Sequence, residues 1–354
     1  MQEKIIPRIT KILYIALRVA IIVGLLRKCR ESTWGRCKSK HSLEGQVFIV
    51  TGANSGIGKQ TVKELAKRKA TVILACRNVE SAIKTVEEIR ACAPNAKLIP
   101  MELDLASRIS IVNFASEVLK NFPQIHVLIN NAGVHIPSFT PVLNENNKKT
   151  WVERKDTTRD GFEIHFGVNH LGHFLLTNLL LPRLQESRPS RVVVVSCSLF
   201  EYGHLDFDNL NGEKRDLFRR FSAKGNINML YYHNSKLANV YFACQLAKIT
   251  QNTGIRVYAA CLDTAYTPFW RHIDKGRPWF LYIIAFPLAI LGMRTANQAA
   301  QTVLHCSTEP SLTSVTGTMY RNCKLYKTRK PLVCQFGERL WQVSEQLSPV
   351  PALP

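Results

Sequence analysis

A tyrosine and a lysine four residues apart are the side chains of this sequence best suited to acid–base chemistry. Tyr232 and Lys236 stand in the run YHNSK, and at this spacing they fall on one face of a helix. A free phenol titrates near pH 10, but an ammonium group beside it stabilises the phenolate and lowers its pKa. Tyr231 lacks such a partner because Ser235 occupies the equivalent place. A Tyr–Lys pair also arises by chance on a helix surface, so its meaning depends on the elements around it.

A glycine-rich turn between a strand and a helix predicts a nucleotide site. Residues 46–58 read QVFIVTGANSGIG, where the apolar run 47–50 is typical of a buried parallel strand and a helical pattern runs from Gly58 through Lys69. Glycines there let the backbone approach a pyrophosphate, and the N–H groups at the helix start stabilise its charge. A bland tight turn is the alternative, but the strand before it and the helix after it favour a dinucleotide fold. The residues expected at the nucleotide are Gly52, Asn54, Ser55, Gly56, Ile57 and Gly58.

Apolar runs and helical patterns alternate along the rest of the chain. Such alternation predicts right-handed βαβ units and a parallel sheet covered on both faces. The polar stretch 138–158 is expected to be a surface insertion. Further strands are expected at 71–75, 97–101, 126–131, 191–196 and 255–262, and further helices at 79–91, 107–121, 161–185 and 230–249.

The N-terminal segment predicts attachment to a membrane. Residues 12–26 are apolar except for Arg18, and the basic residues that follow are typical of a cytoplasmic flank. Fifteen residues are short for a span of about twenty. Lys11 and Arg18 share one helical face, so a helix lying in the membrane interface is the alternative to a spanning one. We therefore assign residues 1–40 to a membrane anchor and a basic juxtamembrane segment.

Composition narrows the class of protein further. The chain has 354 residues, of which 46% are hydrophobic, and this is enough for a substantial core. The net charge of +21 invites a nucleic-acid interpretation, but ten Lys/Arg cluster within residues 1–40 beside the apolar segment, which favours an anionic membrane surface. Ten cysteines without CxxC pairs predict neither a disulfide framework nor a structural zinc site. Free thiols in a reducing cytosol are the simpler interpretation.

A second apolar run, 279–293, is interrupted by Pro287 and is short for a comfortable span. Its position after the sixth strand favours a substrate lid that also touches the bilayer, and a buried helix is the alternative.

Four motifs together resemble the short-chain dehydrogenase/reductase superfamily. They are Thr51-Gly-x-x-x-Gly56-Ile57-Gly58, Asn130-Asn131-Ala132-Gly133, Asn169 in VNHLGHFLL, and Tyr232-x-x-x-Lys236. The stretches ACRN, INNAGV, DGFEIHFGVNHLGHFLLTNLLL and GERLWQVSEQL are similar to the retinol dehydrogenase group, and the likeness covers roughly residues 43–346. The resemblance implies one α/β domain with a Rossmann-type, doubly wound parallel sheet of seven strands in the order 3-2-1-4-5-6-7. This domain would cover residues 41–335, with 336–354 as a C-terminal helix and tail.

The resemblance also implies roles for individual residues. Asn169 would hold a water that relays protons through Lys236, and Tyr232 would exchange a proton with the substrate. Asn130 would support the fourth strand. Further contacts with the cofactor would come from Asp104, Leu105, Asn131, Ala132 and Gly133, besides Tyr232 and Lys236 themselves.

The cofactor is expected to be NADP(H) rather than NAD(H). An acidic residue at the end of the second strand would accept the ribose hydroxyls of NAD. This chain has Cys76 and Arg77 there, and Lys59 beside the glycines, so two cations are placed to bind a 2′-phosphate. His170 and His173 recur in the family helix, and no metal site is expected because no third ligand accompanies them.

Two departures from the family pattern affect the site. The substrate-polarising serine of the family falls on Cys197 in the run Ser196-Cys197-Ser198, and a thiol is a weak hydrogen-bond donor. Ser198 is one residue on and would point to the opposite face if the strand continues. The Pro-Gly pair after the sixth strand appears as Thr264-Ala265, which puts the loop geometry at the nicotinamide in doubt.

These observations lead to two hypotheses of different classes. The first is a membrane-attached oxidoreductase that interconverts a lipophilic alcohol and its aldehyde or ketone, such as a retinoid, a steroid or a related lipid. The second is a cofactor-binding scaffold with weak or no turnover, suggested by Cys197 and Thr264-Ala265. The expected location is the endoplasmic reticulum membrane with the catalytic domain in the cytosol, and a lipid droplet or another intracellular membrane is the alternative. The sequence does not define an oligomeric state, and no nucleic-acid partner is expected.

Overall fold

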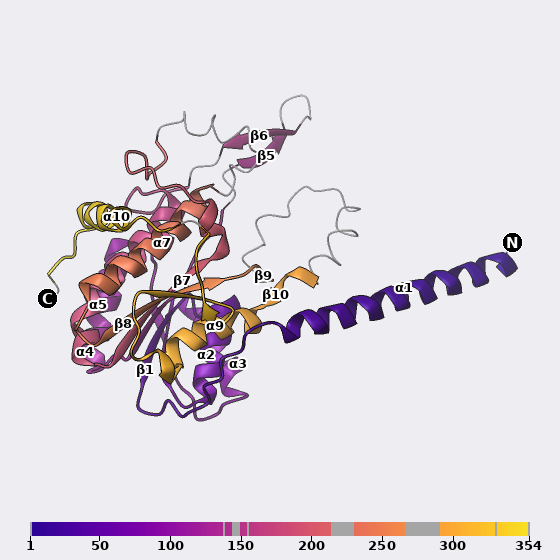
Figure 1. Ribbon diagram of the computed structural model, residues 1–354, viewed down its shortest axis with the longest axis horizontal. Helices are drawn as coiled ribbons and strands as arrows, with labels where there is room; N and C mark the ends of the chain where they lie inside the picture. Colours follow the sequence, from indigo (N-terminus) through magenta and orange to yellow (C-terminus); the bar gives the residue numbers. More distant parts are fainter. Residues whose placement is uncertain are drawn as a thin grey trace.

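The apolar runs of the sequence become the strands of one sheet whose two faces are both covered by helices (Figure 1). The computed structural model describes residues 2–136, 139–143, 149–153, 156–213, 230–266, 291–329 and 331–352. The strands of the main sheet are β1 (Val47–Thr51), β2 (Thr71–Cys76), β3 (Lys97–Glu102), β4 (Val127–Asn130), β7 (Ser190–Cys197), β8 (Ile255–Leu262), β11 (Thr318–Arg321) and β12 (Lys324–Leu325).

The order of these strands is β12-β11-β8-β7-β4-β1-β2-β3. Seven of them are parallel neighbours in the predicted order 3-2-1-4-5-6-7, which confirms the α/β class. The predicted count of seven omitted β12, which pairs antiparallel with β11. The two strands are joined by Asn322 and Cys323, both with positive φ (57° and 55°), which is the backbone of a tight two-residue hairpin.

Alternate residues of the central strands enter two separate cores. Phe48 and Val50 of β1 pack on one face of the sheet, whereas Ile49 packs on the other. The first core is covered by helices α2 (Gly56–Lys67), α3 (Val79–Arg90) and α9 (Ala296–Thr308). The second core is covered by α4 (Arg108–Asn121), α5 (Gly172–Glu186) and α7 (Leu230–Ile249). Burial on both faces explains why the strands read as uninterrupted apolar runs.

The helix expected at 161–185 begins later than predicted. Gly161 has a φ of 85° and Glu163 bridges to Thr157, so the chain is still turning there. The helical part then opens with the π-helix η1 (Phe166–Leu171) and continues as α5. A π-helical turn is a rare local geometry that places one extra residue in the turn and is frequent at functional sites.

The polar stretch at 138–158 contributes a small sheet of its own. Strands β5 (Phe139–Leu143) and β6 (Lys149–Glu153) pair only with each other, in antiparallel register. Figure 1 shows this hairpin standing apart from the main sheet, in agreement with a surface insertion.

The C-terminal helix α10 (Cys334–Leu347) packs onto the second core. The indole of Trp341 lies edge-on to Phe174, with ring centroids 4.9 Å apart, and stacks with Phe242 at 6.0 Å. Three elements far apart in sequence therefore share one aromatic contact.

The N-terminal helix α1 (Gln2–Ser32) extends away from the sheet (Figure 1). Its apolar run carries large side chains that are more than half exposed, namely Tyr14, Leu17, Val19, Ile21, Ile22, Leu25 and Leu26. Among the residues that the structure describes, no helix combines the length and the apolar character that crossing a bilayer requires. The second apolar run, 279–293, lies outside the described residues except for 291–293.

The base of α1 is fixed to the domain by a group of contacts that we call the neck. The guanidinium groups of Arg27 and Arg294 both lie over the Trp34 ring, at 4.6 and 5.0 Å from its centroid. Arg27 also donates to the Met293 carbonyl at 2.5 Å and to Gln298 Oε1 at 3.2 Å. These contacts tie residues near the start of the chain to the start of α9.

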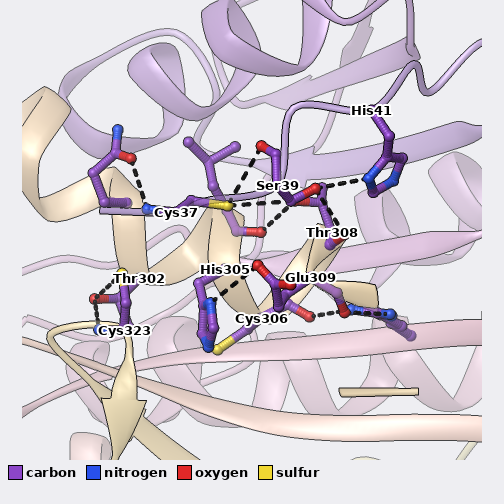
Figure 2. Close-up of polar contacts among 12 residues, drawn as sticks. Cys37, Ser39, His41, Thr302, His305, Cys306, Thr308, Glu309 and Cys323 are labelled. Carbon is purple, nitrogen blue, oxygen red and sulfur yellow. Dashed lines mark hydrogen bonds and ion pairs between the residues drawn. The ribbon is translucent and has the colours of Figure 1, made fainter. Parts of the chain in front are cut away.

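The segment after the neck follows α9 along the first face of the sheet (Figure 2). The Cys37 N–H donates to Gln301 Oε1 at 3.2 Å, and the Ser39 hydroxyl donates to the Thr308 carbonyl at 3.3 Å. These side-chain bonds replace the strand pairing that the segment lacks.

Candidate active site

Helix α7 carries Tyr232 and Lys236 into the interior beside β7. Both are buried, at 7% and 4% exposure, and the ammonium lies 5.7 Å from the centroid of the phenol ring. Lys236 Nζ donates to the Val195 carbonyl at 3.4 Å, and the Lys236 carbonyl accepts from Ser196 Oγ at 2.8 Å. The predicted pair is therefore directed at the end of β7 rather than at solvent.

Burial governs the proton affinity of this pair. It raises the pKa of Tyr232 well above its usual value, and the adjacent Cys197 thiol raises it further. Burial also lowers the pKa of Lys236. The expected lowering of the Tyr232 pKa by the ammonium is therefore wrong for this structure, because removing the phenolate from water outweighs the attraction of a cation that lies over the ring. Tyr232 keeps its proton at neutral pH.

Cys197 is the last residue of β7, and its side chain reaches the site. Its thiol is hydrogen-bonded with the Tyr232 hydroxyl and with the backbone N–H groups of Leu199 and Phe200, and burial raises its pKa. The strand does not continue, because Ser198 opens the 3₁₀-helix η2 (Ser198–Tyr202). Within the described part of the chain, no hydrogen bond joins the Ser198 hydroxyl to Tyr232. The thiol therefore contacts Tyr232, and its role as the polarising group stays a prediction.

Asn169 of η1 holds the loop after β4 against α7. Its Oδ1 accepts from the Val134 N–H at 2.8 Å, and its Nδ2 donates to the Val134 carbonyl at 3.1 Å and to Ser235 Oγ at 2.9 Å. A Cβ on Gly133 would lie 3.3 Å from Lys236 Nζ and 3.4 Å from Asn169 Oδ1. Asn169 and Lys236 therefore border the same backbone position, and the water relay expected between them stays a prediction.

Thr51 joins the ends of β1 and β4. Its hydroxyl accepts from the N–H groups of Asn131 and Ala132, each at 2.9 Å, and lies 2.9 Å from His173 Nε2. Asn131 Nδ2 donates back to the Thr51 carbonyl at 2.8 Å. Burial lowers the pKa of His173 to about 4, so the imidazole is neutral here. The role of His173 is structural, and the sequence alone did not reveal its partner.

The glycine turn leaves a backbone cradle between β1 and α2. Gly52 and Gly56 have φ values of 63° and 53°, which favour glycine. A Cβ on Gly58 would lie 2.3 Å from the Gly52 carbonyl oxygen and 2.6 Å from Asn131 Nδ2. The Ser55 side chain does not cap α2, and the first turn has no acidic residue, so its N–H groups suit an anion.

The neighbouring residues complete the edge of this cradle. Asn54 Nδ2 donates to Ser81 Oγ at 3.0 Å, which fixes the turn against α3, and the partly buried Ile57 packs against the first core. Arg77 is exposed at the end of β2. Lys59 forms an ion pair with Glu88, so of the two expected cations only Arg77 has no ion-pair partner among the described residues.

The expected cofactor residues at the ends of β3 and β4 are held by local contacts. Asp104 is mostly buried, and its carboxylate accepts from the Ala106 N–H at 3.0 Å. Leu105 packs closely on Gly172, where an added Cβ would lie 2.6 Å from the Leu105 carbonyl oxygen. Asn130 Nδ2 donates to Thr177 Oγ1 at 2.8 Å, which anchors the end of β4.

The loop at Thr264-Ala265 is held by pairing and by charge. Strand β9 (Ala265–Tyr266) pairs with β10 (Arg294–Thr295), and the Arg294 N–H donates to the Thr264 carbonyl at 3.0 Å. Asp263, one residue earlier, forms ion pairs with Arg294 at 2.7 Å and Arg321 at 2.6 Å. A pair of arginines thus fixes the loop that in the family carries Pro-Gly.

Comparisons with known proteins agree with this geometry. The family model for short chain dehydrogenases matches residues 46–205. Retinol dehydrogenase 11 of Mus musculus is 38% identical over 336 residues, covering 94% of this chain and 94% of the relative. Retinol dehydrogenase 12 of Homo sapiens is 38% identical, covering 88% and 89%, and human retinol dehydrogenase 13 is 37% identical, covering 89% and 88%.

The chain belongs to the short-chain dehydrogenase/reductase family. Its relatives place it in the retinol dehydrogenase group.

Solved structures show the same fold. An uncharacterized protein from Mycobacterium paratuberculosis matches with a TM-score of 0.62 and 27% identity, covering 91% of this chain and 99% of the other. An NADPH-bound short chain oxidoreductase from Pseudomonas aeruginosa with an atypical catalytic center matches with a TM-score of 0.59 and 18% identity, covering 79% and 96%.

A nicotinamide cofactor is implied by the family, and the residues present fit one. A Cβ would lie 3.0 Å from the nearest atom at Gly52 and 2.3 Å at Gly58, Gly56 has a positive φ, and the uncapped start of α2 suits a pyrophosphate. Gly133 keeps the backbone close to Lys236 and Asn169. In the described part of the chain, no three His, Cys, Asp or Glu side chains converge as a metal set.

Sequence reasoning missed a second group of residues at Tyr232. His135 lies edge-on to the phenol at 5.0 Å between ring centroids, and His165 lies 6.3 Å from it. Glu163 Oε1 contacts His165 Nδ1 at 2.6 Å. The signal that could have pointed to them is the Glu-x-His pair in GFEIHF, placed one helical turn before Asn169.

The cradle yields a prediction about Gly58. Replacing Gly58 with alanine should destabilise the protein by about 1–3 kcal/mol, because the new methyl group would overlap the Gly52 carbonyl. It should also abolish dinucleotide binding, since Gly52 and Asn131 would have to move. Chemical denaturation and titration with NADPH measure both effects. Gly24→Ala is the matched control, because nothing lies within 4 Å of the added methyl group. Unaltered NADPH affinity in Gly58→Ala would contradict the assignment of the glycine turn as the dinucleotide site.

Proposed function

We propose that this protein is a membrane-attached oxidoreductase that interconverts a lipophilic alcohol and its aldehyde or ketone with NADP(H). The observation that carries this proposal is the buried Tyr232 hydroxyl, which is hydrogen-bonded to the Cys197 thiol and stands beside Lys236, whose ammonium borders Gly133. This arrangement can transfer a proton to or from an oxygen held at the same place.

The proposed mechanism assigns each residue a task. A bound nicotinamide supplies or accepts the hydride. Tyr232 remains protonated at neutral pH because burial raises its pKa, so in reduction its hydroxyl donates the proton to the substrate oxygen. The Lys236 ammonium stabilises the tyrosinate that this transfer leaves. Asn169 holds the loop that borders Lys236, and the Cys197 thiol adds a weak second donor at the oxygen.

The substrate class is inferred from the relatives. Retinol dehydrogenases 11, 12 and 13 are named for an apolar polyene alcohol and match this chain over about nine-tenths of its length. We therefore propose a retinoid, a steroid or a related lipid as the substrate.

The choice of NADP(H) rests on charge at the end of β2. An NAD-binding protein is expected to have an acidic residue where this chain has Cys76. The next residue, Arg77, is exposed, and its guanidinium can form a bidentate pair with a 2′-phosphate. Lys59 is held by Glu88 and would have to leave that carboxylate to contribute.

Membrane attachment rests on the exposed apolar side chains of α1 and the basic residues after them. Exposure of many large apolar groups on one helix is typical of a surface that contacts lipid. We propose that α1 attaches the protein to the endoplasmic reticulum membrane with the catalytic domain in the cytosol. A lipid droplet or another intracellular membrane would offer the same surface.

A second candidate function is favoured by one observation. Cys197 supplies a poor donor in place of a hydroxyl, so the chain could bind the cofactor and turn over slowly or not at all. The two functions are separated by incubating the purified protein with NADPH and a panel of lipophilic aldehydes and ketones. Oxidation of NADPH with any of them supports the enzyme, whereas NADPH binding without turnover supports the scaffold.

Substitution of Cys197 gives a sharp prediction. A well-placed donor at a developing oxyanion typically contributes about 10²–10³ in rate, and the thiol supplies only part of it. Cys197→Ser should therefore raise kcat, and Tyr232→Phe should abolish turnover while leaving NADPH binding largely intact. Ser198→Ala is the matched control and should change little. Loss of activity in Ser198→Ala, with Cys197→Ser neutral, would transfer the polarising role to Ser198.

Cofactor preference gives the next prediction. NADPH should bind more tightly than NADH. Arg77→Ala should reduce the ratio of the two dissociation constants, because a charged hydrogen bond from Arg77 to the 2′-phosphate contributes about 1.5–3 kcal/mol. Fluorescence titration of both cofactors measures this. Arg90→Ala, at the last turn of α3, is the control for a general loss of positive charge. Equal dissociation constants for the two cofactors in the unmutated protein would refute the assignment.

Attachment is tested by fractionation. The full-length protein should pellet with microsomal membranes and resist extraction by high salt, because apolar contacts are not screened by ions. Deleting residues 1–26 removes most of α1 but keeps Arg27 and Trp34, and should release protein into the soluble fraction. Full-length protein found in the soluble fraction would exclude α1 as an anchor.

A further inference from the structure

The backbone beyond β4 is held by side chains of the segment that leads into η1. Val134 has both its N–H and its carbonyl bonded to Asn169, at 2.8 and 3.1 Å. The Ile136 N–H donates to His165 Nε2 at 2.9 Å. His135 stands between these two fixed residues, so the direction of its side chain is set by contacts on both sides.

The hydrogen bonds around His165 determine which of its nitrogens carries the proton. Because Nε2 accepts from Ile136, the proton must be on Nδ1, which lies 2.6 Å from Glu163 Oε1 and donates to it. The Glu163 carboxylate also accepts from the N–H groups of His165 at 3.0 Å and Phe166 at 2.8 Å. Glu163 and His165 are both buried, at 3% and 2% exposure. The pair is thus a rigid clamp on Ile136.

The clamp places an imidazole beside the residue that would donate the proton. His135 is 4% exposed, and its ring meets that of Tyr232 edge-on, with 5.0 Å between centroids and an interplanar angle of 89°. Its ring lies 6.0 Å from that of His165. A phenylalanine would fill the same space with a purely apolar wall. An imidazole instead brings one hydrogen-bond donor and one acceptor next to the Tyr232 ring.

We infer that His135 is a specificity-determining residue that binds a second oxygen of the substrate, close to the carbon that reacts. The inference rests on the proposed function, since it needs Tyr232 to hold the first oxygen. It narrows the substrate to a lipophilic carbonyl compound or alcohol with a hydroxyl or carbonyl group on the adjacent carbon. Glu163 and His165 are positioning residues, because they act by holding Ile136 and hence His135.

The test compares two substrates that differ by one oxygen. Decanal and its α-hydroxy derivative are reduced by the full-length protein with NADPH, and the ratio of the two kcat/KM values is measured. The unmutated protein should prefer the hydroxylated aldehyde by about 10-fold, the contribution of one good hydrogen bond. His135→Phe should bring the ratio close to one, and His135→Gln, which keeps a donor and an acceptor, should restore part of the preference.

The positioning role is tested by the same ratio. Glu163→Gln keeps the shape of the side chain but weakens its hold on His165, and should lower the preference several-fold, mainly through KM of the hydroxylated aldehyde. His170→Phe is the matched control, because His170 is equally buried on η1 but bonds to Ser344 of α10. It should leave the ratio as it is. Thermal unfolding of each variant separates a changed ratio from a loss of folded protein.

Each result is decisive. Equal kcat/KM for the two aldehydes in the unmutated protein would overturn the inference about His135 and leave the proposed function intact. A ratio that His135→Phe does not alter would show that the imidazole only packs against Tyr232. Absence of turnover with either aldehyde, and with the wider panel, despite NADPH binding would overturn the inference and the proposed function together.

Discussion

The site depends on how the backbone beyond β4 satisfies its hydrogen bonds. Residues 131–136 have left the sheet, so their N–H groups need partners other than a neighbouring strand. Thr51 accepts from residues 131 and 132, Asn169 from residue 134 and His165 from residue 136. These three side chains come from β1, η1 and the turn before it. One requirement of the main chain therefore unites the glycine cradle, Asn169 and the histidines beside Tyr232.

The same requirement explains why the site is buried and mostly neutral. Tyr232 and Lys236 are buried beside this loop, and Cys197 is half-buried. Each of these groups is then shifted toward its uncharged form. A tyrosine that retains its proton suits donation to a carbonyl oxygen. Proton affinity in the site is thus set chiefly by burial.

Particular residues show how far the sequence could lead. The buried strands and the Tyr232–Lys236 pair were predictable because apolar runs and helical spacing are local patterns. The direction of the Tyr232 pKa was not, since it depends on burial by segments distant in the chain. The clamp on Ile136 also joins residues about thirty positions apart. The hairpin at Asn322 and Cys323 was not predicted, because cysteine rarely adopts a positive φ, although asparagine does so more readily.

The neck has a consequence for the order of events during synthesis. Arg27 binds Gln298, which lies 271 residues later in the chain, so this contact forms only after nearly the whole domain has been translated. At about 5–20 residues per second, α1 precedes its dock by roughly 15–55 s. During that interval the helix is free of the domain and meets the surroundings of the ribosome first. The contacts of Arg27 and Arg294 with Trp34 are then among the last to form, and they fix the orientation of the folded domain relative to a helix that was made before it.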